Sequence, residues 1–170
     1  MGLKYPGGPN VQRCAMDGSP CIPMPKMLKG GGGYNLSYSG SKTAVINYCN
    51  TKNQKGEDFS KADVACSFQC AAIDVLVEKT IMAAKETGVD TVTVGGGVAA
   101  NDYLRLTLYA ACQKEGLKLV LPEKRYCTDN AAMIASEGLV QYRLGNFAKM
   151  DLNAKASIPL SATWKTGDKV

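Results

Sequence analysis

The sequence predicts an α/β fold in which helices flank a partly parallel β-sheet. Two observations support this class: residues 60–145 alternate helix, strand, helix, strand and helix, and the connections between these elements are short. Strands joined through a helix in this way usually lie parallel in one sheet, with a right-handed crossover. The chain has 170 residues, 45% of them hydrophobic and 21% charged, as expected for one globular domain with a sizeable core.

The segment 1–33 is predicted to be mostly irregular. Five prolines and four consecutive glycines at 30–33 interrupt it, and proline both fixes φ and removes a backbone donor. A short helix over 9–16 is compatible with Pro9 in its first turn. Residues 34–39 alternate in polarity and predict a strand that ends at Gly40, and residues 41–50 predict a short helix.

Residues 60–87 form the clearest predicted helix. Ser60 is a favourable N-cap, apolar residues then recur at helical spacing, and Gly88 is a suitable C-cap. The β-branched run 91–94 predicts a buried strand. The remaining predicted elements are a helix over 101–115, a strand over 117–121, a helix over 128–142, an edge strand over 156–160 and a tail.

The residue types present exclude several kinds of site within this chain. It contains no histidine, which excludes Ser-His-Asp and Cys-His nucleophilic sites and histidine-ligated zinc. Seven cysteines are irregularly spaced; Cys66 and Cys70, on one face of a predicted helix, are interpreted as reduced core thiols rather than a metal site. The net charge of +5 suits a polyanionic partner, and it suits a solubilising surface equally well.

The expected location is the cytoplasm. No apolar run in the sequence reaches the roughly 18 to 20 residues that a membrane helix needs. Residues 1–6 also lack the apolar stretch of a secretory signal.

The most informative motif is Val94-Gly95-Gly96-Gly97-Val98-Ala99-Ala100-Asn101, between a predicted strand and helix. Glycines there allow close approach of a ligand, and the amides at the start of the next helix favour an anion such as a nucleotide phosphate. Ligands of open α/β sheets also bind at the carboxyl ends of strands. The run matches neither a dinucleotide-binding nor a Walker pattern, and a simple tight turn is an equally good interpretation.

Three further motifs each have a simpler structural interpretation. In residues 127–133, Asp129 could bind a hard cation, although a helix cap at Thr128 or Asp129 is favoured by spacing alone. The turn 5–9 exposes backbone amides, and a plain turn explains it. Lys42, within 37–43, could meet a phosphate, although a surface lysine after a serine cap explains it too.

Taken together and in this order, these motifs resemble the bacterial type of the tRNA threonylcarbamoyl transferase family, formerly described as O-sialoglycoprotein endopeptidases. The matching runs extend over nearly the whole chain to about residue 160, and they are 5–9, 36–45, 96–101 with Leu104-Arg105, and 127–135. The resemblance implies the C-terminal half of an actin-like ATPase fold. Residues 1–33 would continue from an N-terminal lobe, 34–160 would form the C-terminal lobe, and 161–170 a tail.

The resemblance also implies an activity and a site. The enzyme would move threonylcarbamoyl from threonylcarbamoyl-AMP to the amino group of the adenosine beside the tRNA anticodon. ATP or the adenylate would contact a set of residues made up of Gly8, Gln12, Gly96, Gly97 and Asn101. Asp129 would be one ligand of an iron or zinc ion acting as a Lewis acid. The implied partners are tRNA, an inactive actin-like paralogue and a small P-loop ATPase.

Two departures from the family pattern bear on activity. The other metal ligands of the family are histidines of an N-terminal lobe, so Asp129 alone should not retain a metal. Gln12 stands where the family usually has an acidic residue, which removes a charge-assisted contact. The chain alone is therefore expected to be inactive, and a lobe without its neighbour would expose apolar surface and could self-associate.

Two other functions remain open from the sequence. A non-catalytic actin-like module that binds a nucleotide or a partner is the main alternative. A protease is the least supported, because the chain has no histidine base and no Gly-x-Ser-x-Gly elbow.

Overall fold

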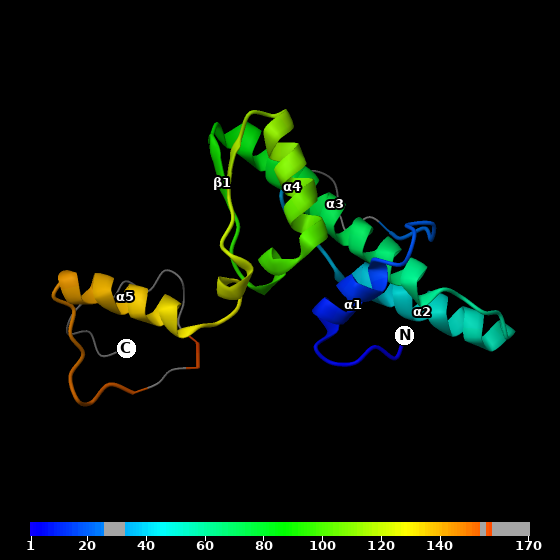
Figure 1. Cartoon of the computed structure of the whole chain (residues 1–170), viewed down its shortest axis with the longest axis horizontal. Coiled ribbons are helices and arrows are strands. Elements are labelled where there is room, and N and C mark those ends of the chain that lie inside the picture. The colour runs from blue at the N-terminus through cyan, green and yellow to red at the C-terminus, as the bar shows by residue number, and fades with distance from the viewer. Residues whose placement is uncertain (26–32, 154–155, 158–170) are drawn as a thin grey trace. The chain divides into compact units, whose positions relative to one another are not determined.

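The structure is a computed structural model that describes residues 1–25, 33–153 and 156–157. These residues divide into two compact units, Met1–Thr128 and Asp129–Val170, which are described separately (Figure 1). Among the residues that the structure describes, the first unit has four α-helices and a small sheet, and the second has one helix. The α/β class predicted from the alternation over 60–145 is confirmed.

The sheet of the first unit consists of two parallel strands joined by a helix. Strand β1 (Thr91–Thr93) pairs with β2 (Lys118–Val120), so that Val92 lies opposite Leu119. Between them run a 3₁₀ turn, η1 (Gly97–Ala100), and helix α4 (Asp102–Lys114), and a second 3₁₀ turn, η2 (Lys124–Tyr126), follows β2. The predicted strands and the helix between them are therefore present.

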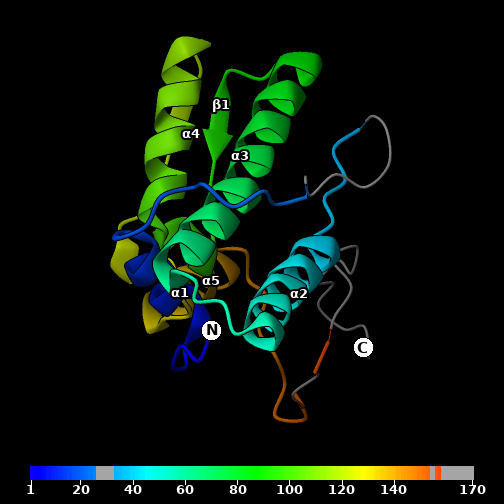
Figure 2. The same cartoon turned by 90° about the vertical axis from the view of Figure 1, so that its right-hand side faces the viewer.

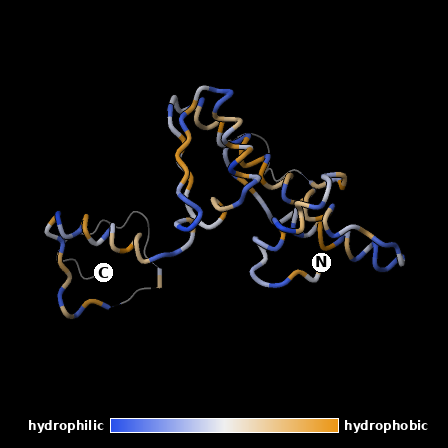
Figure 3. The backbone as a smooth tube through the Cα atoms, viewed as in Figure 1, coloured by the Kyte–Doolittle hydropathy of each residue, from blue (hydrophilic) through white to orange (hydrophobic). Residues whose placement is uncertain are grey.

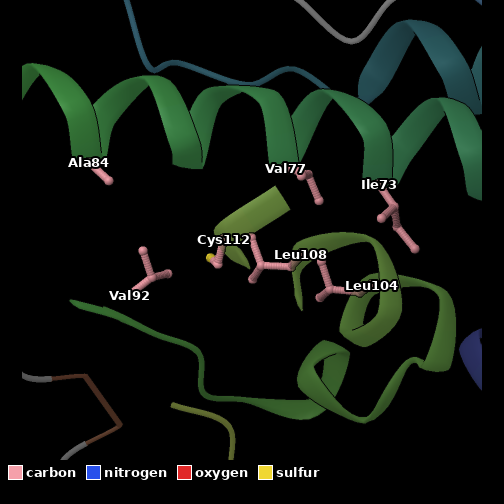
Figure 4. Close-up of a cluster of buried hydrophobic side chains, with 7 residues drawn as sticks. All are labelled: Ile73, Val77, Ala84, Val92, Leu104, Leu108 and Cys112. Atoms are coloured by element: carbon pink, nitrogen blue, oxygen red, sulfur yellow. The ribbon is translucent and has the colours of Figure 1, made fainter. Parts of the chain in front are cut away.

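Helix α3 (Lys61–Thr87) is the longest element, and it begins and ends as the sequence predicts. The Ser60 hydroxyl accepts a hydrogen bond from the Asp63 N–H at 3.1 Å, and Gly88 ends the helix with a left-handed φ of 68°. Its apolar stripe faces α4 and β1. The core, shown in Figure 4, comprises Ile73, Val77, Ala84, Val92, Leu104, Leu108 and Cys112.

The short helix predicted over 9–16 is present as α1 (Gly7–Ala15), and it packs on α3 (Figure 2). The chain that follows is held closely against the start of α3. A Cβ on Gly18 would lie 2.1 Å from the Ala62 carbonyl oxygen, so only glycine fits there.

The strand predicted over 34–39 is absent, and that prediction was wrong. Only Leu36 makes an isolated bridge, and helix α2 (Ser39–Lys55) already begins at Ser39. The buried Lys79 ammonium of α3 donates hydrogen bonds to the carbonyl oxygens of Gly33 and Asn35. These carbonyls satisfy a buried charge and are no longer available to a strand ladder.

The second unit is described through helix α5 (Ala131–Arg143). Its N-cap is Asn130, whose side chain accepts a hydrogen bond from the Met133 N–H at 3.1 Å; neither Thr128 nor Asp129 caps it. Hydrophobic residues recur along α5 (Figure 3), yet none of its residues is buried among the described part of the chain. Most of the predicted edge strand 156–160 and the tail 161–170 lie outside the described residues.

None of the helices that the structure describes is both long enough and apolar enough to cross a lipid bilayer.

Candidate functional site

The candidate site is built on the glycine turn that follows β1. Gly96 has φ 88° and ψ 172°, a conformation that residues with a Cβ rarely adopt. Residues 95–98 are exposed, and a Cβ added to Gly95 or Gly96 would meet no described atom within 4 Å. The backbone of the turn is therefore open to a ligand from solvent, as the motif predicts.

Asn101 fixes the end of this turn to the start of α4. Its Oδ1 accepts a hydrogen bond from the Leu104 N–H at 2.9 Å, which makes it the N-cap. Its Nδ2 donates to the Gln69 Oε1 of α3 at 3.0 Å. The side chain is thus held in one orientation by contacts with two helices.

Gln12 of α1 reaches the same helix start. Its Nε2 donates to the Asp102 Oδ2 at 2.9 Å, and its Oε1 accepts from the Asp102 N–H at 3.1 Å. The Lys124 ammonium also forms an ion pair with the Asp102 carboxylate. The structure therefore brings Gln12 next to Asn101, although the two are far apart in sequence.

Gly8 lies one helical turn before Gln12, on the same face of α1. It is exposed, and a Cβ there would meet no described atom within 4 Å. The four predicted residues Gln12, Gly96, Gly97 and Asn101 surround the start of α4, and Gly8 extends this group along α1.

Arg105 was not proposed from the sequence as a site residue, although it holds the glycine turn in place. Its guanidinium donates to the carbonyl oxygen of Ala99 at 2.9 Å and to that of Pro122 at 3.0 Å. These two bonds join the turn after β1 to the loop after β2. Its position four residues after Asn101, on the same face of α4, was the signal available in the sequence.

Tyr103 adds a second polar link between α4 and α3. Its hydroxyl donates to the Asp74 Oδ1 at 2.9 Å. Burial raises the pKa of Tyr103 well above its ordinary value, and hydrogen bonds to Cys70 and Asp74 raise it further. The phenol therefore stays protonated and keeps donating at neutral pH.

A cavity of about 300 Å³ lies beside the turn, between α3, β1 and α4. Leu76 and Thr80 of α3, Gly95 and Val98 of the turn, and Leu104 of α4 are among its lining residues. Its lining is mostly apolar, so it suits an apolar part of a ligand whose polar groups meet the turn.

The other predicted residues lie elsewhere. Lys42 is exposed in the first turn of α2, where the Ser41 hydroxyl is buried without a hydrogen-bond partner among the described residues. The Thr128 methyl lies 3.9 Å from where a Cβ of Gly97 would be. Asp129 is exposed and belongs to the second unit.

The chain does not by itself fit the metal ion that the resemblance implies. It has no histidine, and no group of three or more Cys, Asp or Glu side chains within the described residues could hold a metal ion. A single carboxylate at Asp129 would leave most of the coordination shell to other ligands.

Comparison with known proteins agrees with the motifs. The pattern of the family described as TsaD, tRNA N6-adenosine threonylcarbamoyltransferase, matches residues 1–136. Proteins with that name from Geobacillus kaustophilus and Bacillus subtilis are each 45% identical to the chain, over 94% and 95% of its length. The chain spans about half the length of these curated relatives, 47% in each case.

One solved structure has a similar fold. The crystal structure of T. kodakarensis HypF superposes with a TM-score of 0.57 and 20% sequence identity. The match covers 85% of this chain and 18% of that one, and at this identity it concerns the fold alone. The family pattern, by contrast, covers most of the chain and includes the glycine turn, Asn101 and Asp129. The chain therefore belongs to the tRNA N6-adenosine threonylcarbamoyltransferase family.

Proposed function

We propose that this chain forms the C-terminal portion of an enzyme that transfers threonylcarbamoyl from threonylcarbamoyl-AMP to the adenosine next to the tRNA anticodon. The observation that carries the proposal is the open glycine turn at the start of α4, within a region matched by the family. The relatives named above are described as tRNA N6-adenosine threonylcarbamoyltransferases, which supports the proposal.

The residues around the turn are suited to an adenylate. Glycines 96 and 97 present backbone without side chains, and they lie at the N-terminal, positive end of the α4 dipole. Two amides of that end, those of Asp102 and Leu104, already donate to Gln12 and Asn101. Asn101, fixed by Gln69, and Gln12, paired with Asp102, would orient the ligand from two sides, with Gly8 giving room along α1. We assign these residues to binding rather than to bond making.

The remaining parts of the proposed site come from beyond these residues. The fold of the chain is proposed to be one lobe of an actin-like ATPase, which closes over its nucleotide together with a second lobe. Asp129 is proposed as one ligand of an iron or zinc ion whose other ligands the chain does not supply. tRNA, an inactive actin-like paralogue and a small P-loop ATPase are the proposed partners, in the cytoplasm.

A complementation assay tests this function. The chain is incubated with tRNA and threonylcarbamoyl-AMP carrying labelled threonine, alone and joined to the N-terminal portion of the Bacillus subtilis relative. We expect label in tRNA only from the joined protein, and a strong loss in its Asn101→Ala variant.

The matched control is the Bacillus subtilis relative whose own N-terminal and C-terminal portions are joined at the position used in the chimera. If the rejoined relative is active while the chimera binds no adenylate and transfers nothing, the proposed function is wrong. Transfer by the chain alone would instead contradict the expectation that it is inactive by itself. Adenylate binding without transfer by the chimera would favour a non-catalytic binding module.

A further inference from the structure

Three thiols gather where the segment after α1 crosses the start of α3. Cys66 and Cys70 are four residues apart in α3, and with Asp63 and Ser67 they share one face of that helix. The backbone N–H of Ser19 donates to the Asp63 Oδ1 at 2.8 Å. The N–H of Ile22 donates to the Ser67 hydroxyl at 3.0 Å.

These two hydrogen bonds hold the chain on both sides of Cys21 against the α3 residues on both sides of Cys66. Cys21 lies between Ser19 and Ile22, and Cys66 lies between the two residues of α3 that accept their hydrogen bonds. Cys21 is exposed and Cys66 is half-buried, so an oxidant can reach the first thiol from solvent. Burial raises the pKa of Cys66, and Cys70, Asp63 and Cys21 raise it further. The thiol form of Cys66 is therefore the resting form at neutral pH.

We propose that Cys21 and Cys66 form a reversible disulfide that fastens the segment after α1 to α3. Neighbouring side chains at i and i+4 of a helix keep their Cβ atoms about 5 to 6 Å apart. A disulfide needs about 3.5 to 4.5 Å, so Cys66 and Cys70 cannot pair without distorting α3. Cys21 is on a different, irregular segment, so helix geometry does not fix its distance from Cys66, which makes it the better partner.

The reaction is exchange with a small-molecule disulfide, RSSR. The Cys21 thiolate attacks one sulfur of RSSR, which forms a mixed disulfide and releases one RSH. The Cys66 sulfur then attacks the Cys21 sulfur, the bond to RS breaks, and a second RSH leaves. Two protein thiols become one disulfide, RSSR is reduced to two RSH, and the two thiol protons go to the released thiols. Excess RSH reverses both steps.

The cross-link would act on the helices that form the glycine-turn site. The segment that carries Cys21 follows α1, and α1 supplies Gln12 to the start of α4. The helix that carries Cys66 also carries Gln69, which orients Asn101. The disulfide therefore restrains α1 on α3 and, through them, the contact at Asp102. In a reducing compartment it would be transient, as intracellular regulatory disulfides are.

Peptide mapping of the full chain tests the proposal. The protein is incubated with glutathione disulfide or with reduced glutathione, free thiols are alkylated, and trypsin is added without reductant. Cleavage leaves Cys14 and Cys21 together in peptide 14–26, and Cys66 and Cys70 together in peptide 62–79. We expect the oxidised sample alone to contain these two peptides joined, and dithiothreitol to separate them. The melting temperature should rise by about 5 to 10 °C on oxidation.

Single-residue variants identify which two cysteines form the disulfide. Cys21→Ser and Cys66→Ala should each abolish the joined peptide and the rise in melting temperature, while Cys14→Ser and Cys70→Ser should keep both. Circular dichroism of each reduced variant shows that it folds; if Cys66→Ala does not, Cys66→Ser replaces it. A cross-link that survives Cys21→Ser, a disulfide inside peptide 62–79, or mixed glutathione adducts alone would each overturn the proposal.

Discussion

Helices α3 and α5 have similarly apolar sequences, but they differ in what covers them. Eight residues of α3 are buried, and its stripe joins α4 and β1 in a common core. No residue of α5 is buried among the described residues, and Ile134 and Tyr142 are 76% and 66% exposed. A helix apolar on most sides is normally covered. The difference shows that apolar composition alone does not bury a helix: α3 shares a core with α4 and β1, whereas the described residues of α5 share none.

The largest expected effect comes from comparing one substitution, leucine to alanine, in α4 of the first unit and in α5 of the second. Leu108 of α4 is 2% exposed and Leu139 of α5 is 50% exposed. Leu108→Ala should lower the free energy of unfolding by about 2 to 5 kcal/mol, because it removes buried methyl groups and leaves a cavity. Leu139→Ala should change it by about 0.5 kcal/mol or less. Urea unfolding of both variants checks this, and equal losses would mean that α5 is packed as firmly as α4.

A second comparison concerns two asparagines that both act as helix N-caps, one in each unit. Asn101 and Asn130 cap α4 and α5, and Asn101 also donates a hydrogen bond to Gln69 of α3. Asn101→Ala should cost about 2 kcal/mol, because the cap is lost and Gln69 loses its donor. Asn130→Ala should cost about 1 kcal/mol through the loss of the α5 cap.

Hydrogen exchange resolved by peptide separates these two effects. Asn130→Ala should speed exchange in α5 alone, while Asn101→Ala should speed it in α4. Asn101→Ser is the matched control, because a serine can cap α4 but lacks the amide N–H group that donates to Gln69. Faster exchange of α4 in the Asn130→Ala variant would break the distinction between the two regions.

Local signals in the sequence were sufficient for most elements of the first unit. Ser60 and Gly88 mark the two ends of α3 in the sequence, because a cap acts on the backbone next to it. The glycine turn between β1 and α4 was predictable for the same reason. The strand over 34–39 was predicted wrongly because the carbonyl oxygens of Gly33 and Asn35 accept hydrogen bonds from Lys79. Lys79 is more than forty residues away in the sequence, so the local pattern gives no sign of this contact.

The contacts that complete the site were also beyond the sequence. Gln12 and Asp102 are 90 positions apart, and only the packing of α1 on α3 brings them together. Similarly, the Arg105 bond to Pro122 depends on the parallel pairing of β1 with β2. The family resemblance proposes which residues contact a ligand, but it gives no account of what orients them.

Changing the charge at Gln12 tests the contact between α1 and α4. Gln12→Glu replaces a donor to the Asp102 carboxylate with a second negative charge, and its cost should be about 1 kcal/mol at neutral pH. Gln12→Ala, which only removes the bonds, is the control and should cost less. The excess cost of the glutamate should vanish as pH falls and one carboxyl is protonated, because a protonated acid can donate again. An excess that persists at low pH would mean that repulsion is not its cause.

The smallest expected effect is at the C-terminal ends of α3 and α4. There Lys85 of α3 and Glu115, the C-cap of α4, form an ion pair at 2.7 Å. The hydrogen bond from Lys85 and then its charge lower the pKa of Glu115 below its ordinary value of 4.5. Because the folded pKa is lowered, the pair stabilises the fold above the unfolded pKa, and this contribution is lost as pH falls through the folded pKa. Lys85→Met should therefore be slightly less stable at neutral pH and should converge with the parent protein in acid, with a gap that shrinks in high salt. Thermal unfolding across pH checks this, and a gap independent of pH would assign the loss to packing of the lysine stem rather than to its charge.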